Sequence, residues 1–153
     1  MSPITPYAIE TSEQELVDLK QRLAMTRWPD AETPDDWSQG IPLDYMKEVH
    51  AYWMSEYDWP TRLAALNQWP GFKTNIDGLD FHFLHIKSES PHAKPLVLTH
   101  GWPGSIVEFQ KVISPLVDPS SAGGDPADAF HLVVPTLPGF GYSGKPKIGR
   151  AHV

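Results

Sequence analysis

A short segment near residue 100 combines chemically capable side chains with a backbone that must turn sharply. Residues 100–104 read H-G-W-P-G and follow an apolar run, residues 96–99, that reads L-V-L-T. Two glycines and a proline in five positions predict unusual backbone geometry. In open α/β sheets, ligands bind where strands end at their carboxyl edge. This segment is therefore the first candidate for a binding or catalytic site.

Two other groups of side chains have the right chemical types, but their context argues against each. The run G-Y-S-G-K around Ser143 resembles the G-x-S-x-G nucleophile motif, yet Lys145 takes the place of the last glycine. No buried strand leads directly into Ser143. His82 and His85 could suggest a metal site, but their odd spacing puts them on opposite faces of a strand. We therefore expect no serine nucleophile and no metal, and interpret both histidines as structural or solvent-facing.

The elements around the H-G-W-P-G segment follow from local patterns. The run 96–99 shows no alternation of apolar and polar residues, which suits a strand covered on both faces. Ser105, with Glu108 three residues later, forms a capping-box pattern that begins a helix. The expected apolar face of this helix consists of Ile106, Phe109, Val112, Ile113 and Leu116. Strand, tight turn and helix together favour an α/β fold.

Two more strand signals flank this unit. Residues 72–86 are typical of a hairpin, because Asp77-Gly78 is a type I′ turn signal between apolar runs. Residues 130–134 predict another buried strand. It is followed by a segment rich in glycine and proline, residues 135–146, so a second irregular loop is expected at the carboxyl end of a strand.

The first seventy residues have a different character, with 5 of the 6 tryptophans and 7 of the 16 prolines. Ser12 and Glu15 form a capping box at the start of a helix that ends near Thr26. A second helix is expected over about residues 43–57, and a short third one after Pro60. These helices offer few apolar positions for a core of their own. We interpret them as a helical wrapper packed on something larger, with Trp37 as the apolar anchor of an acidic loop.

Composition limits the classes of partner. The chain has 153 residues, is 41% hydrophobic, lacks cysteine and carries a net charge of −7, all of it in the first seventy residues. An acidic chain of this kind is a poor match for nucleic acid or an anionic membrane surface. No signal peptide and no membrane-spanning run of about 18 apolar residues is visible. We expect a cytoplasmic protein, and its oligomeric state stays open.

The motifs, taken in order, resemble one family. H-G-W-P-G-S at 100–105 and P-T-L-P-G-F-G-Y-S-G-K-P at 135–146, preceded by R-W-P-D at 27–30 and P-L-D-Y at 42–45, are similar to microsomal-type epoxide hydrolases. The similarity extends over about residues 12–147. It implies an N-terminal fragment of an α/β-hydrolase fold, with a helical N-terminal region at 1–71 and the first strands and first helix of the hydrolase core at 72–147.

The resemblance also implies a chemistry. In this family an aspartate opens an epoxide through a covalent ester, which water then hydrolyses to a vicinal diol, without metal or organic cofactor. The backbone N–H of Trp102 would form part of the oxyanion hole. His100, Gly101 and Pro103 would complete the oxyanion turn, with a cis peptide bond before Pro103. Trp102 and Tyr142 would contact a small-molecule epoxide, and the amide would face a solvent-poor crevice. A role in detoxification would follow.

The expected nucleophile, catalytic base and cap tyrosines have no counterpart in this chain, so we expect it to be inactive by itself. His100 lies in the oxyanion turn, which favours structural hydrogen bonding over a role as base. Residues 148–153 read I-G-R-A-H-V, which back-translates to a common sequencing adapter, so we expect a non-native tail. Two alternatives stay open: a fragment of a related hydrolase, such as a haloalkane dehalogenase or esterase, and a non-catalytic fragment.

Overall fold

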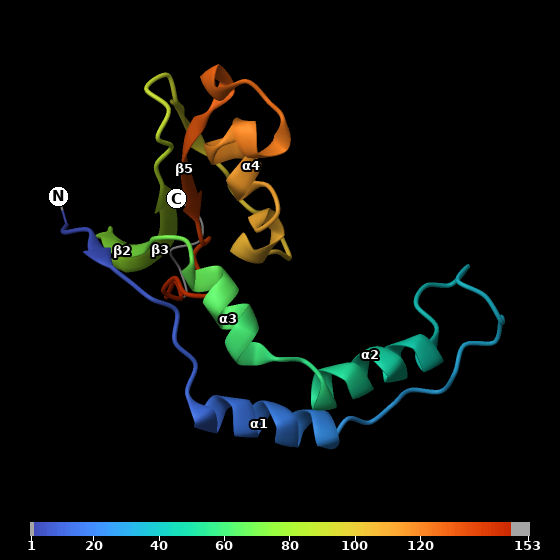
Figure 1. Ribbon diagram of the computed structural model, residues 1–153. Coiled ribbons are helices and arrows are strands. Elements are labelled where there is room, and N and C mark those ends of the chain that lie inside the picture. The colour runs from blue at the N-terminus through green and yellow to red at the C-terminus, as the bar shows by residue number, and fades with distance from the viewer. Residues whose placement is uncertain (1, 148–153) are drawn as a thin grey trace. The chain divides into compact units, whose positions relative to one another are not determined.

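The computed structural model describes residues 2–147 and divides the chain into two compact units (Figure 1). Of the described residues, the sheet unit contains 2–9 and 63–147. The helical unit is Glu10–Arg62. The division expected between residues 71 and 72 is of another kind, because it separates the two regions that the family resemblance implies. That division stays a prediction. The expected tail at 148–153 lies outside the described residues.

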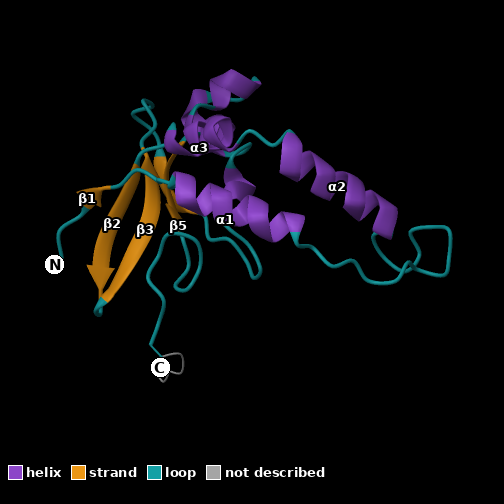
Figure 2. Cartoon of the chain, turned by 90° about the horizontal axis from the view of Figure 1, so that it is seen from below, coloured by secondary structure: helices purple, strands orange, loops and turns teal. Residues whose placement is uncertain are grey.

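A five-stranded sheet, with the order β1-β2-β3-β5-β4, organises the sheet unit (Figure 2). The pairs β1–β2, β2–β3 and β3–β5 are antiparallel, and the pair β4–β5 is parallel. The bounds are β1 Thr5–Pro6, β2 Gly71–Ile76, β3 Leu79–Ile86, β4 Lys94–Val97 and β5 Phe130–Pro135. The parallel pair places the ends of β4 and β5 at the same edge of the sheet.

The hairpin of β2 and β3 forms where the turn signal predicts it. Asp77 has a φ of 51° and Gly78 a φ of 83°. Type I′ turns require positive φ at both central residues, and aspartate and glycine tolerate it best. Ile76 consequently pairs with Leu79 across the turn. The predicted hairpin is confirmed.

The strand before the H-G-W-P-G segment differs from its expectation. β4 begins at Lys94 and ends at Val97, and it lies at an edge of the sheet. Val97 is 61% exposed, so the prediction of a strand covered on both faces over 96–99 is wrong. Among the described residues only β5 pairs with β4, and burial of a strand depends on neighbours that its own sequence does not reveal. Leu98 still continues the pairing, since its N–H donates to the Val133 carbonyl over 3.0 Å.

The core of the sheet unit lies between the sheet and the segment after residue 105. Leu132, Val134 and Ile113 are fully buried and Ile106 is 2% exposed. The predicted helix over 105–116 is split into a 3-10 turn, η1 (Ile106–Phe109), and α4 (Ile113–Val117). Pro115 explains the break, because it has no N–H for the carbonyl four residues earlier and its ring crowds that carbonyl. Val112, placed on the expected apolar face, is 41% exposed.

Two further 3-10 turns complete the connection to β5. They are η2 (Pro119–Ala122) and η3 (Pro126–Asp128). Gly123 ends η2 in the left-handed conformation, where glycine avoids the steric cost of a Cβ. This connection ends at Ala129, directly before Phe130, the first residue of β5.

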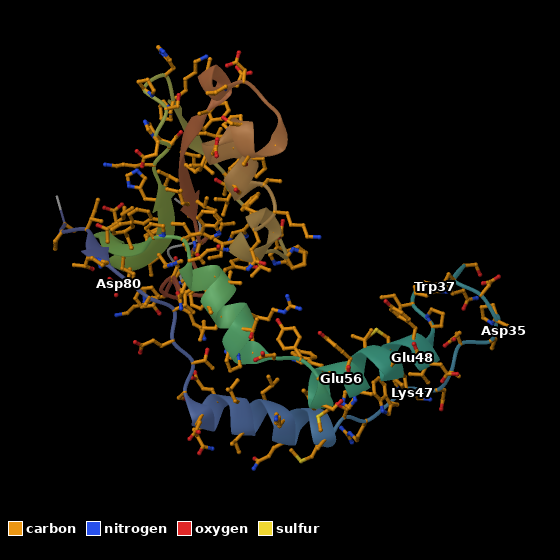
Figure 3. The ribbon with its side chains drawn as sticks, in the orientation of Figure 1. Asp35, Trp37, Lys47, Glu48, Glu56 and Asp80 are labelled. Carbon is orange, nitrogen blue, oxygen red and sulfur yellow. The ribbon has the colours of Figure 1, made fainter. Side chains whose placement is uncertain are left out.

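The helical unit contains α1 (Glu13–Ala24), α2 (Leu43–Ser55) and the start of α3 (Trp59–Asn67), whose remainder belongs to the sheet unit. The capping box at Ser12 and Glu15 is present, as predicted. None of residues 10–62 is buried. Trp37, which is labelled in Figure 3, is 59% exposed, and its ring packs edge-to-face on Tyr45 with ring centroids 5.1 Å apart, so it anchors the acidic loop on α2 without being buried. Across residues 2–147, no helix is both long and apolar enough to cross a membrane.

Candidate active site

The expected oxyanion turn follows β4, next to the glycine-rich loop that follows β5. Gly101, Trp102 and Pro103 are exposed, and Trp102 is 84% exposed. The Trp102–Pro103 peptide bond is cis, which confirms the prediction. The expectation that the Trp102 amide faces a solvent-poor crevice stays a prediction. The turn lies beside the free edge of β4, where no described strand supplies an opposite wall.

His100 is the buried member of this turn. It is 2% exposed, and its ring stacks edge-to-face on Phe140 at 5.3 Å. Its Nε2 accepts a hydrogen bond from the Leu137 N–H over 3.1 Å, and its Nδ1 lies 3.0 Å from the Gly101 carbonyl oxygen. Both ring nitrogens are therefore engaged with backbone groups. This agrees with the structural role expected for His100 and leaves no free nitrogen to act as a base.

The amide of Trp102 has different surroundings. Within residues 2–147, no hydrogen-bond acceptor is assigned to the Trp102 N–H, and it takes no part in strand pairing. Backbone donors usually find a partner in protein or in water. An unpaired N–H in a turn that is held on both sides is available to an external acceptor.

Gly104 and the capping box hold the other side of the turn. The Ser105 N–H donates to Glu108 Oε1 over 2.9 Å, and the Ser105 hydroxyl accepts from the Val107 N–H over 3.3 Å. A Cβ on residue 104 would lie 2.7 Å from the Gly101 carbonyl oxygen, so only glycine fits there without displacement. The carboxylate of Glu108, the first acid after the turn, is thus engaged in capping.

A second buried polar cluster ties β3 to the loop after β5. His82 is fully buried, and its Nδ1 lies 2.8 Å from the Thr136 hydroxyl. The Ser143 hydroxyl accepts from the His82 N–H over 3.0 Å and donates to the Thr136 carbonyl over 2.7 Å. Burial, and secondarily the charge of Lys73, lowers the pKa of His82 to about 4, so the ring is neutral at pH 7.

These contacts decide two of the sequence interpretations. Both hydrogen-bonding roles of the Ser143 hydroxyl are used internally, which agrees with its exclusion as a nucleophile. The expected opposite orientation of His82 and His85 is confirmed, since His82 is buried and His85 is half-buried on the other face of β3. In the described part of the chain, no three His, Asp or Glu side chains are grouped so that they could hold a metal ion.

Tyr142 lies against His82, with ring centroids 5.2 Å apart, and it packs on the core. Burial, and secondarily Tyr7, raises the pKa of its hydroxyl. Its expected contact with a substrate stays a prediction, as do the roles of Trp102, His100, Gly101 and Pro103 in catalysis.

Comparison with known proteins identifies the family. A family model described as "Epoxide hydrolase N terminus" matches residues 4–109. The chain belongs to the epoxide hydrolase family. A relative from Stigmatella aurantiaca, itself assigned only provisionally as an epoxide hydrolase, is 51% identical over 143 residues, covering 94% of this chain and 32% of the relative. Epoxide hydrolase 1 of Oryctolagus cuniculus is 40% identical over 146 residues, with 92% and 32% covered.

Solved structures give the same result for the fold. The epoxide hydrolase of Aspergillus niger superposes with a TM-score of 0.82 at 33% identity, covering 97% of this chain and 38% of that one. The juvenile hormone epoxide hydrolase of Bombyx mori superposes with a TM-score of 0.81 at 34% identity, and the match covers 95% of this chain and 34% of that one. The chain thus has the fold of the N-terminal part of an α/β-hydrolase. It spans about a third of the length of the curated relatives it matches.

Sequence reasoning missed two members of these clusters. In this epoxide hydrolase chain the Thr136 hydroxyl contacts His82, and the Leu137 N–H donates to His100. The sequence pattern of the loop after β5 indicates only turns. One signal was available for His82, because period-two alternation puts it on the face of Leu84 and Ile86. No comparable signal exists for Leu137, since its contribution is a backbone N–H.

Proposed function

We propose that this chain supplies the oxyanion donor for epoxide hydrolysis, through the backbone N–H of Trp102. In the first step an aspartate carboxylate attacks an epoxide carbon, the C–O bond breaks and the alkoxide oxygen takes a proton. In the second step a general base takes a proton from water as the water oxygen adds to the carbonyl carbon of the resulting ester. The Trp102 N–H donates to the oxyanion that forms there, and collapse releases the vicinal diol and regenerates the carboxylate.

The observation that carries this proposal is the free N–H of Trp102 in a turn held by buried contacts. His100 and Gly104 fix the backbone on both sides of the Trp102 N–H, and no described group accepts a hydrogen bond from it. Oxyanion donors are effective because they are aimed before charge develops, and one donor contributes about 2.7–4 kcal/mol in other hydrolases. The chemistry needs only carboxylate, water and acid groups, so we propose no metal and no organic cofactor.

The substrate class is a small-molecule epoxide. This follows from family membership, and two relatives in Ctenocephalides felis are named for juvenile hormone epoxides. We extend to this chain only the epoxide group that the relatives share. A cytoplasmic location and a role in detoxification belong to the same proposal.

A direct test removes the N–H without removing the side chain. Residues 4–147 would replace the matched part of the Aspergillus niger enzyme, and Trp102 would be exchanged for its α-hydroxy acid, which turns the amide into an ester. We expect kcat to fall about 10²–10³-fold, the loss typical of one oxyanion donor. The matched control, Trp102→Ala, keeps the N–H and should lower kcat far less. Equal losses in both variants would contradict the backbone role.

The chain by itself should not turn over epoxides. No Asp or Glu occurs in residues 98–104 or 136–144, the two segments at the carboxyl ends of β4 and β5. The first acid beyond the turn, Glu108, is engaged with Ser105. Purified chain incubated with styrene oxide should form no diol above the buffer rate, with the Aspergillus niger enzyme as the positive control. Diol formation above buffer would show that a nucleophile is present in the chain.

A further inference from the structure

The ring of His100 joins two backbone segments, and one of these contacts falls on the peptide group that carries the Trp102 amide. We infer that His100 is a positioning residue: held in a single tautomer, it fixes the direction of the Trp102 N–H and strengthens it as a donor. The catalytic meaning of this inference rests on the proposed function. Its geometric content rests on three hydrogen-bonding groups and can be tested separately.

The tautomer follows from the partners of the two ring nitrogens. Leu137 presents an N–H to Nε2 at 3.1 Å, and this N–H is a donor only. Nε2 must therefore be the unprotonated nitrogen of a neutral ring. The proton then resides on Nδ1, which donates to the Gly101 carbonyl oxygen at 3.0 Å. Protonation of Nε2 would place two donors against each other.

The Gly101 carbonyl and the Trp102 N–H belong to one peptide group. Among residues 2–147 the only cis peptide bond is Trp102–Pro103, so the Gly101–Trp102 bond is trans. A trans peptide is planar, with its C=O and N–H pointing in opposite directions. Holding the Gly101 oxygen on His100 therefore aims the Trp102 N–H away from the ring.

The same contact polarises the amide. Chains of hydrogen bonds strengthen one another, because donation to a carbonyl increases the positive charge on the N–H of its peptide group. Here the chain runs from the Leu137 N–H through His100 and the Gly101 carbonyl to the Trp102 N–H. Its start lies in the loop after β5 and its end in the turn after β4. A shift of either loop would thus be transmitted to the oxyanion donor.

The ring itself is well fixed for this task. His100 is 2% exposed and packs edge-to-face on Phe140. A buried ring with both nitrogens engaged can turn only by breaking two hydrogen bonds. This distinguishes His100 from Trp102, which is 84% exposed.

The sequence allows a selective measurement. The dipeptide Gly-Trp occurs once, at 101–102, and Thr-Leu occurs once, at 136–137. Labelling glycine with ¹³C at the carbonyl and tryptophan with ¹⁵N isolates the one peptide group in question by NMR. Adding ¹⁵N-labelled histidine and leucine allows detection of a scalar coupling across the Leu137 N–H to His100 Nε2 bond. The signals can be recorded in solution or, with magic-angle spinning, on sedimented protein.

Two variants separate the two ring contacts. His100→Asn keeps a donor where Nδ1 lies and loses the acceptor for Leu137. His100→Gln keeps an acceptor where Nε2 lies and loses the donor to Gly101. We expect the Gly101 carbonyl ¹³C and the Trp102 ¹⁵N resonances to move upfield in His100→Gln and to move less in His100→Asn. The Leu137 coupling should be lost in both variants, because neither keeps a nitrogen acceptor.

The wild-type chain decides the question even if a variant fails to fold. A ring protonated on Nδ1, with a measurable Leu137–His100 coupling, supports the inference. A ring protonated on Nε2, an absent coupling, or equal shifts of the Gly101–Trp102 group in both variants would overturn it. These outcomes are independent of the ester substitution at residue 102, which tests the oxyanion role. A positive NMR result with no loss of kcat there would leave the positioning intact and reject the proposed function.

Discussion

The two units of this chain reach order by different means. The sheet unit buries a core in which Leu132, Val134 and Ile113 are fully shielded from solvent. The helical unit, residues 10–62, has regular helices and a capping box but no buried residue. Side chains as large as Trp53 and Met46 remain 44% and 38% exposed there.

This difference separates local order from tertiary stability. Helix propensity favours α1 and α2, and a capping box supports α1, but isolated short helices are marginal in water without packing. Burial of apolar surface supplies most folding free energy. We therefore expect the sheet unit to unfold cooperatively and the helical unit to open at much lower free energy.

The largest expected effect comes from truncating a side chain in the core of the sheet unit. Leu132→Ala should lower the free energy of unfolding by about 2–5 kcal/mol, because it leaves a cavity at a fully buried site. The matched control is Val17→Ala in α1, at a site that is 46% exposed. This substitution should change the free energy of unfolding by about 0.5 kcal/mol or less. Urea titration followed by circular dichroism measures both. Similar losses would mean that the units share one core.

The second-largest expected effect is that of low pH, which should lower the free energy of unfolding of the sheet unit. The pKa of His82 is about 4 in the folded chain and 6.5 when unfolded, so the unfolded chain takes up the proton more readily. Stability is then complete above pH 6.5 and falls as the pH drops from 6.5 toward 4, by about 2–3 kcal/mol after allowance for solvent screening. Denaturant titrations across this pH range measure the loss.

His82→Asn is the control for this pH effect. It keeps a polar atom near Thr136 but does not titrate. Its unfolding free energy should therefore depend less on pH between 6.5 and 4 than that of the wild-type chain. An unchanged slope would assign the acid sensitivity to other groups.

The same capping motif occurs in both units and allows a finer comparison. Ser12→Ala and Ser105→Ala each remove a side-chain cap, at a typical cost of about 1 kcal/mol. In the sheet unit this loss should appear in global unfolding, because η1 carries the buried Ile106. In α1 it should appear only as faster amide hydrogen exchange of that helix. A global effect of Ser12→Ala would show that the two units unfold together.

The smallest effect on stability should come from the edge of the sheet. Val97→Lys changes an exposed side chain on β4, so the free energy of unfolding should shift by about 0.5 kcal/mol or less. Its effect should instead be on association, because unpaired apolar edges promote strand pairing between chains. Sedimentation velocity should detect more monomer in the variant. A wild-type chain that is already monodisperse and monomeric would rule out edge-driven association.

Much of the local structure is predictable from sequence. The hairpin turn at Asp77-Gly78, the capping boxes at Ser12 and Ser105, and the cis bond before Pro103 all lie where residue patterns or the family resemblance put them. Each depends on residues within a few positions of one another. The split of the helix after Ser105 was also within reach, because Pro115 interrupts it.

The sequence by itself determined the hairpin turn, the capping boxes, the starts of α1 and α2 and the family of this protein, because those features depend on local sterics and on motifs in fixed order. Only the tertiary structure decided that β4 lies at an edge, that the ring of His82 contacts the Thr136 hydroxyl, and that His100 bridges two loops. The physical reason is range: burial and strand neighbours are set by groups distant in the chain, and the partner of His100 at residue 137 is a backbone N–H that every residue except proline carries.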